Sequence, residues 1–265
     1  MSVTAKAKAS VNFMPSKADG GKFSSWDSSR IEQKLVAVEI DALNMRELDR
    51  LPSVDVEGFT LAKHPIDGDW TDRAWLDEVY VPTCLDLVKK LTGATTVLNI
   101  YYPIIRSSGG PEADGKVAPP APFIHYDQTR EAYAEQAAKT AAEAGHKLGR
   151  KAAVFNVWKA ISPAPQPVPL ALCDQRDVPE EDFVLGVTLE GGTETPYVSL
   201  LPPSKPYPLY YVPDLKIDES LVFMTANFDP AKPLGVAHTA IANPRGTEGL
   251  PARRSVELRI LALFD

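Results

Sequence analysis

Three residues have the types and spacing of a metal site. His125-Tyr126-Asp127 is an HxD motif in a strand-like segment, and because side chains alternate along a strand, its histidine and aspartate would point to the same face. An imidazole and a carboxylate placed in this way can bind one metal ion from one side. His238, in the apolar segment GVAHTAI, would complete a 2-His-1-carboxylate triad, which leaves positions on Fe(II) open for a chelating cosubstrate and O₂.

Each piece also has an ordinary structural interpretation. The chain has four histidines and 35 acidic residues, so a single His-x-acid pair is a frequent coincidence, and a surface His-Asp pair is the simpler interpretation of the HxD motif alone. His238 alone could be a half-buried strand histidine with a hydrogen-bond partner. The other two histidines are interpreted as structural: His64 as a turn residue before a proline, and His146 near the end of a helix, where a cation favours the helix dipole.

A charged segment near the C-terminus could bind a carboxylate. In RRSVELR, the side chains of Arg253, Ser255, Glu257 and Arg259 would share one face of a strand, where several charges are costly without partners. An arginine with a serine two positions on can hold a carboxylate by a bidentate ion pair and a hydroxyl hydrogen bond. The alternative is an internal pair between Glu257 and an arginine. We expect both, with one arginine on the ligand and Glu257 orienting another.

Aromatic and amide side chains could line a pocket beside these groups. Asn156 and Trp158 would share one face of a strand. Asn156 could donate toward a cosubstrate or substrate with Trp158 as a pocket wall, or the pair could be a buried tryptophan beside a hydrogen-bonded asparagine; both interpretations stay open. Tyr101 and Tyr102 precede Pro103 and could line the same barrel, although ordinary packing is favoured for both. The candidate substrate-pocket residues are Trp158 and Tyr102.

Short strands and turns dominate the elements that must position these residues. Helices are expected over Asp69–Gly93, kinked or divided by Pro82, and over Arg130–Gly149. Residues 1–32 are predicted to be a polar tail or irregular wrap, and residues 33–265 a single domain. The spacing of the strands favours a β-sandwich or a jelly-roll barrel, with the earlier helices packed outside. The expected strands are Lys34–Ala42, Gly58–His64, Thr95–Arg106, Phe123–Thr129, Lys151–Ile161, Asp182–Leu189, Pro208–Val212, Ser220–Asp229, Gly235–Ile241 and Ser255–Phe264.

Composition excludes several classes of protein. The chain has 265 residues, of which 44% are hydrophobic, so it can build a core. A net charge of -7 without basic clusters argues against nucleic-acid binding. Cys84 and Cys173 lie far apart, which excludes a disulfide framework and favours buried free thiols in a reducing compartment. The sequence shows neither the apolar run of about 20 residues of a membrane span nor a signal peptide, so a soluble cytoplasmic protein is expected.

The order of HxD, a long gap, histidine and Arg-x-Ser is far more specific than its parts. It resembles the fungal hydroxylase/desaturase family that includes aspergillic-acid-type hydroxylases and gibberellin-desaturase-like proteins, and it is similar to the bacterial CmcJ-like oxidoreductases. The likeness runs from about Lys34 to the C-terminus. The segments that carry it are His125–Thr129, Asn156–Trp158, Pro169–Asp174, Asp218-Glu219, His238 and Arg253–Arg259.

This resemblance implies a non-haem Fe(II)/2-oxoglutarate-dependent oxygenase on a double-stranded β-helix, the jelly-roll or cupin-like core of a mainly β fold with flanking helices. Such an enzyme activates a C–H bond of a small specialised-metabolite intermediate by hydroxylation, desaturation or oxidative cyclisation, and it produces succinate and CO₂ from 2-oxoglutarate and O₂. The implied iron ligands are His125, Asp127 and His238. The implied 2-oxoglutarate residues are Arg253 and Ser255, with Arg259 as second choice and Asn156 as a further candidate.

The chain departs from the family pattern at three places. Lys159-Ala160, Arg254 and Ala226 replace the usual residues, and we interpret them as marks of a changed substrate pocket. They keep one alternative open, a catalytically inactive cupin-like binding or partner subunit. A second alternative is a metal-dependent hydrolase that uses the triad with zinc. A hydrolase would not need the Arg-x-Ser pair. The predicted partner is a small-molecule substrate, without nucleic acid or membrane, and a homodimer is left open.

Overall fold

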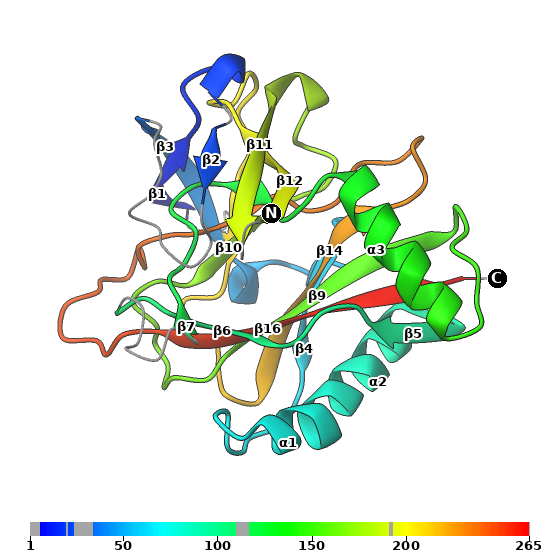
Figure 1. Cartoon of the computed structure of the whole chain (residues 1–265). Coiled ribbons are helices and arrows are strands. Elements are labelled where there is room, and N and C mark those ends of the chain that lie inside the picture. Colours follow the sequence, from blue (N-terminus) through cyan, green and yellow to red (C-terminus); the bar gives the residue numbers. More distant parts are fainter. Residues whose placement is uncertain (1–5, 20, 24–33, 110–116, 191–192, 265) are drawn as a thin grey trace.

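Two facing β-sheets form the body of the protein in this computed structural model, which describes residues 6–19, 21–23, 34–109, 117–190 and 193–264 (Figure 1). The helices are α1 (Arg73–Trp75), α2 (Val81–Thr92) and α3 (Arg130–Glu143), and a π-helical turn, Leu76–Tyr80, joins the first two. The strands are β1 (Lys6–Phe13), β2 (Lys22–Phe23), β3 (Val36–Asn44), β4 (Phe59–Lys63), β5 (Thr96–Asn99), β6 (Ile104–Ser107), β7 (Val117–Ala118), β8 (His125–Tyr126), β9 (Ala152–Ala160), β10 (Leu170–Cys173), β11 (Phe183–Glu190), β12 (Thr193–Leu200), β13 (Leu209–Tyr211), β14 (Glu219–Asn227), β15 (His238–Ala240) and β16 (Arg254–Leu263).

The order of the strands is that of a double-stranded β-helix, so the predicted mainly β fold with a jelly-roll core is confirmed. One sheet has the order β1-β3-β13-β10-β15-β8-β12-β11-β2. The other has the order β4-β14-β9-β16-β6-β7, with β5 also paired to β16. Trp158 and Phe223 from the second sheet pack with Leu172 of the first, which fills the space between the sheets with apolar side chains.

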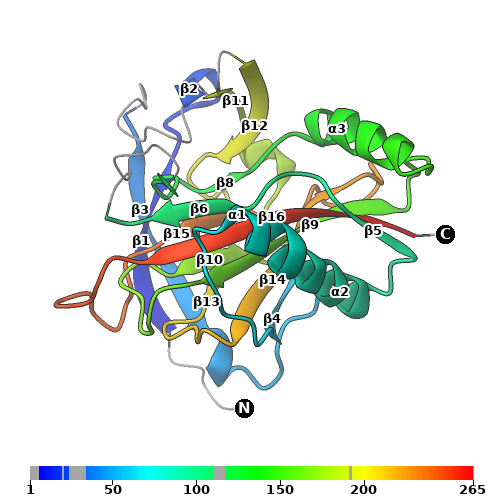
Figure 2. The ribbon, with the colours of Figure 1, turned by 60° about the horizontal axis from the view of Figure 1, so that its bottom comes forward.

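The run from α1 to α2 covers the outer face of the second sheet, and α3 lies against its other face. Val88 of α2 packs in one cluster with Val256 and Leu258 of β16, so the run from α1 to α2 lies across this sheet (Figure 2). Helix α3 packs against the far end of the sheet through Tyr133 and Ala137. Among the helices in the described part of the chain, none is long and apolar enough to cross a bilayer.

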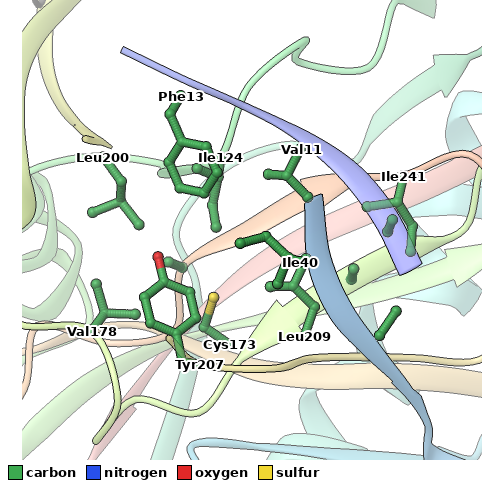
Figure 3. Packing of buried hydrophobic residues seen from close by; sticks show 14 of the residues in the cluster. Val11, Phe13, Ile40, Ile124, Cys173, Val178, Leu200, Tyr207, Leu209 and Ile241 are labelled. Carbon is green, nitrogen blue, oxygen red and sulfur yellow. The ribbon is translucent and has the colours of Figure 1, made fainter. Parts of the chain in front are cut away.

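The first sheet gains its outer strands from the N-terminal segment. β1 pairs antiparallel with β3 along its whole length, and Val11 and Phe13 are buried beside Ile40 (Figure 3). Burying side chains of this size contributes roughly 1.5–3 kcal/mol each. The prediction of a tail or irregular wrap for residues 1–32 is therefore wrong for Lys6–Phe13, while residues 1–5, 20 and 24–33 lie outside the described part of the chain.

Most of the other predicted elements are present, with differences that have local causes. The helical segment predicted over Asp69–Gly93 is confirmed, with Pro82 in the first turn of α2, where a proline is tolerated. Helix α3 begins as predicted because the Thr129 hydroxyl accepts from the Ala132 N–H, but it ends at Glu143, and Gly145 then adopts φ +79°.

Among the strands that were not predicted, β10 and β12 were missed because prolines precede or interrupt them. β10 follows the proline-rich run that ends at Pro169, and β12 contains Pro196. Pro103 separates β5 from β6, both of which pair with β16. Cys84 and Cys173 are free and buried, as expected.

Lys159 is fully buried and serves the fold rather than a pocket. Its side chain points to the outer face of β9, where its ammonium group donates to the carbonyl oxygens of His64 at 3.0 Å, Glu219 at 3.3 Å and Ile217. His64, which follows the end of β4, is buried as well, with Nδ1 2.9 Å from the Ser220 hydroxyl oxygen. The lysine thus supplies all three of its donors to backbone acceptors.

Replacing Lys159 by methionine is expected to lower the free energy of unfolding by about 3 kcal/mol, because three carbonyl groups lose a donor at roughly 1–3 kcal/mol for each buried unsatisfied group. Urea denaturation at neutral pH measures this change. Lys90→Met, at an exposed position of α2, is the matched control and should shift stability by at most about 0.5 kcal/mol. Equal stabilities of the two variants would contradict the role given to Lys159.

Candidate active site

The structure brings His125, Asp127 and His238 together on neighbouring strands of the first sheet. β15 pairs with β8 so that His238 lies directly opposite His125, and Asp127 follows β8. Asp127 Oδ1 is 4.0 Å from His125 Nε2 and 3.8 Å from His238 Nε2. One ligand atom from each residue lies within 4.8 Å of the other two, a spacing at which all three can bind the same metal ion.

Both imidazoles are oriented by the backbone two residues before them. His125 Nδ1 is 3.0 Å from the Phe123 carbonyl oxygen, and His238 Nδ1 is 3.3 Å from the Val236 carbonyl oxygen. A carbonyl oxygen only accepts, so each Nδ1 carries the proton and each Nε2 keeps its lone pair for a ligand. Burial, helped by neighbouring His238, lowers the pKa of His125 to about 4, which favours the neutral imidazole that metals bind.

Asp127 sits at the end of a row of buried charges. Arg259 Nη2 donates to Asp127 Oδ1 at 2.7 Å and lies 3.4 Å from Glu257 Oε1, and Arg106 Nη2 donates to the same Glu257 oxygen at 3.1 Å. Burial alone would raise the pKa of Asp127, but the adjacent Arg259 and the two imidazoles bring it below its ordinary value. The carboxylate is therefore ionised and available as a ligand.

Two cavities meet at this group of residues. The outer cavity has a volume of about 340 Å³, and its walls include Tyr102, Phe123 and Tyr197. The inner cavity, of about 30 Å³, is bounded by Trp158 and Arg253. The first two triad residues, together with Arg106 and Ala121, border both cavities, so a metal held here would face each of them.

Arg253 and Ser255 have buried polar atoms without hydrogen-bond partners. Arg253 is 1% exposed; its Nη1 donates to the Val168 carbonyl oxygen at 2.8 Å, and its guanidinium lies 5.3 Å from the Trp158 ring centre. Arg253 Nε and Ser255 Oγ have no partner. Burial, with Arg106 nearby, lowers the pKa of Arg253 to about 10. Such donors are costly to leave unsatisfied, and a carboxylate would satisfy them.

The remaining candidates divide between the two cavities and the sheet. Trp158 borders the inner cavity, and Tyr102, 65% exposed, borders the outer one, with the Arg73 guanidinium 3.7 Å from its ring centre. Asn156 is fully buried opposite Arg259 on β16, and neither its amide nitrogen nor its amide oxygen has a hydrogen-bond partner. Its side chain thus has capacity for a ligand or a water molecule.

The three departures from the family pattern lie away from both cavities. Lys159 points outward, Arg254 lies on the same outer side of its strand, and Ala226 packs against α3. None of them borders either cavity. Sequence reasoning missed two residues of the site. Arg106 could have been noticed as a single arginine directly after the apolar pair Ile104-Ile105. Tyr133 could not, because nothing in the α3 sequence distinguishes it from a core residue.

Comparison with known proteins gives consistent matches along the whole chain. A family model described as an oxidoreductase/YMDC permease-like domain matches residues 8–263. The alpha-ketoglutarate-dependent dioxygenase phiK of a fungal species is 30% identical over 87% of this chain and 84% of its own length. The hydroxylase/desaturase efuI of Hormonema carpetanum is 27% identical over 96% of this chain and 94% of its own length.

Solved structures share the fold. A variant of the iron and alpha-ketoglutarate-dependent endoperoxidase NvfI superposes with a TM-score of 0.83 at 20% identity, and the match covers 98% of this chain and 99% of the other. The relative nvfI of Aspergillus novofumigatus is 27% identical over 78% of this chain and 77% of its own length. Similarity of this extent places the two sheets in a common architecture.

Proposed function

The chain belongs to the oxidoreductase family of the fungal Fe(II)/2-oxoglutarate-dependent dioxygenases, and from this premise we propose that His125, Asp127 and His238 bind its iron. One observation carries the assignment: a half-buried imidazole and a buried one, each with Nδ1 engaged by a carbonyl, direct Nε2 toward the same carboxylate oxygen within 4.0 Å. A set of two imidazole nitrogens and one carboxylate suits Fe(II) and leaves open positions.

The cosubstrate is 2-oxoglutarate, the alpha-ketoglutarate of the relatives' names. We assign its far carboxylate to Arg253 and Ser255, because the unsatisfied Arg253 Nε and Ser255 Oγ lie on the strand face that borders the inner cavity. Trp158 forms a wall of that cavity, and Asn156 is a further donor on the neighbouring strand. Arg259, the second choice for the carboxylate, already contacts Asp127 and Glu257, which favours Arg253.

The outer cavity is the proposed place of the substrate, a small specialised-metabolite intermediate. When bound, Fe(II) and 2-oxoglutarate supply activated oxygen for an unactivated C–H bond, with succinate and CO₂ as coproducts. The protein orients the substrate: Tyr102, Phe123 and Tyr197 offer apolar faces, and Gln128 offers an amide, which suits a ring system with a few polar groups. Hydroxylation, desaturation and oxidative cyclisation all begin from this arrangement.

Family membership and the Arg253–Ser255 pair favour this oxygenase over a binding subunit or a zinc hydrolase. A hydrolase has no use for a buried carboxylate-binding pair next to its metal. A homodimer and a cytoplasmic location are further parts of the proposal, the latter in keeping with the buried free thiols of Cys84 and Cys173.

Anaerobic addition of Fe(II) and then 2-oxoglutarate to the metal-free protein tests the proposal. We expect a visible metal-to-ligand charge-transfer band that needs both additions. The band should be absent from the His238→Ala variant and retained in His146→Ala, because His146 is exposed beyond the end of α3. Bound iron without such a band would favour the binding-subunit or hydrolase alternatives instead.

A further inference from the structure

Both oxygens of the Asp127 carboxylate accept hydrogen bonds, one from β16 and one from α3. Oδ1 accepts from Arg259 Nη2 at 2.7 Å, and Oδ2 accepts from the Tyr133 hydroxyl at 3.4 Å. Oδ1 is also the oxygen that lies within 4.0 Å of both imidazole Nε2 atoms. Protein groups thus fix the orientation of the carboxylate, with Oδ1 toward the two histidines and Oδ2 toward α3.

Arg259 is itself held in place by charge and by packing. Its guanidinium lies 3.4 Å from Glu257 Oε1, and Arg106 holds the same oxygen at 3.1 Å. The Tyr101 ring centre is 5.7 Å from the guanidinium carbon. Asp127, Arg259, Glu257 and Arg106 thus form a row of alternating charge whose side chains are 5–13% exposed.

A buried row of alternating charges contributes little net free energy to the stability of a fold. Buried ion pairs lose much of their attraction to desolvation, and apolar side chains of similar volume often stabilise a protein as well. The row ends at Asp127 Oδ1, the oxygen that lies within 4.0 Å of both histidine Nε2 atoms. That placement points to a role at the metal site rather than in the core.

We propose that Arg259 and Tyr133 are positioning residues that keep Asp127 bound to the metal through one oxygen, Oδ1. This inference rests on the proposed iron site. A carboxylate that turned to bind through both oxygens would fill a further coordination position, which the cosubstrate and O₂ require. Arg259 supports Oδ1 through its second lone pair, and Tyr133 donates to Oδ2.

Metal binding without turnover tests this role. Mn(II) affinity is measured by the loss of the free-ion EPR signal, and the absorption bands of the Co(II) protein report coordination number. Arg259→Gln should weaken Mn(II) binding by about 10–100-fold, the usual cost of losing a partner of a metal ligand, and change the Co(II) bands. Tyr133→Phe keeps the ring packing and should change the Co(II) bands with a smaller loss of affinity. Arg259→Lys should recover part of the affinity.

The matched control is Arg254→Gln, which removes the neighbouring arginine from the opposite face of β16, where it borders neither cavity. It should bind Mn(II) as the wild type does when 2-oxoglutarate is absent. Wild-type Mn(II) affinity and Co(II) bands in both Arg259→Gln and Tyr133→Phe would overturn the inference, as would equal losses in Arg254→Gln and Arg259→Gln. If the wild type binds neither ion, the proposed iron site itself fails. If Arg259→Gln does not fold, the Mn(II) affinities and Co(II) bands of Tyr133→Phe and Arg259→Lys test the inference instead.

Discussion

Replacing His238 by alanine is expected to abolish formation of succinate from 2-oxoglutarate while the protein stays folded. The imidazole is one of only two nitrogen ligands in the proposed triad, and its Nε2 is directed toward Asp127 Oδ1. Loss of the metal's contribution, several kcal/mol, corresponds to at least about a thousandfold lower turnover. Succinate is measured with candidate substrates and with none, in protein reconstituted with Fe(II).

His146→Ala is the control for this experiment, because it removes an exposed imidazole outside the site and should leave turnover unchanged. Far-UV circular dichroism and the thermal midpoint establish that His238→Ala is folded. His238 also packs against the Phe223 ring, at 4.8 Å between ring centres, so a drop of a few degrees in the midpoint is expected. Full turnover in His238→Ala would remove His238 from the metal site.

Local patterns predicted much of the fold and the strand faces of the candidate site. Alternation along the strand predicted that Arg253, Glu257 and Arg259 share one face of β16. In the structure this face points inward, and Glu257 pairs with Trp158 of the neighbouring strand β9. The expectation that Glu257 would orient an arginine also agrees with the contacts. These features depend only on a strand's two-residue period, which short stretches of sequence display.

Contacts that depend on how distant strands pair and face one another could not be predicted from these local patterns. Arg259 and Asp127 are 132 residues apart, and they meet only because β16 of one sheet faces β8 of the other. The role of Arg106 likewise depends on where β6 joins β16. The strand β1 was missed because its polar residues face outward and only alternate positions such as Val11 are buried, which resembles the composition of a tail.

The same limits explain why the departures from the family pattern were misjudged. Lys159, Arg254 and Ala226 were interpreted as marks of a changed pocket, yet none borders either cavity. Lys159 stands one residue from Trp158, but alternation sends the two side chains to opposite faces of β9. A residue directly next to a motif residue on a strand therefore packs on the outer face of the sheet. Its replacement gives no information about which substrate the enzyme accepts.

Replacing Arg253 by alanine is expected to raise the 2-oxoglutarate concentration for half-maximal turnover about a hundredfold. Losing one partner of a buried, hydrogen-bonded charge pair costs about 2–5 kcal/mol, and every 1.4 kcal/mol is tenfold in affinity. The requirement for Fe(II) should stay near that of the wild type, since Arg253 contacts the Val168 carbonyl and the Trp158 ring rather than a triad residue. Titration of the charge-transfer band gives the 2-oxoglutarate affinity independently of turnover.

Arg254→Ala is the matched control, because it removes the neighbouring arginine from the opposite face of β16. Its side chain borders neither cavity, so the 2-oxoglutarate requirement should change by less than about threefold. Ser255→Ala should give an intermediate effect, since it removes a single neutral hydroxyl donor worth about 1 kcal/mol. If Arg253→Ala and Arg254→Ala behave alike, the inward face of β16 does not hold the cosubstrate, and the unsatisfied Asn156 amide becomes the alternative anchor.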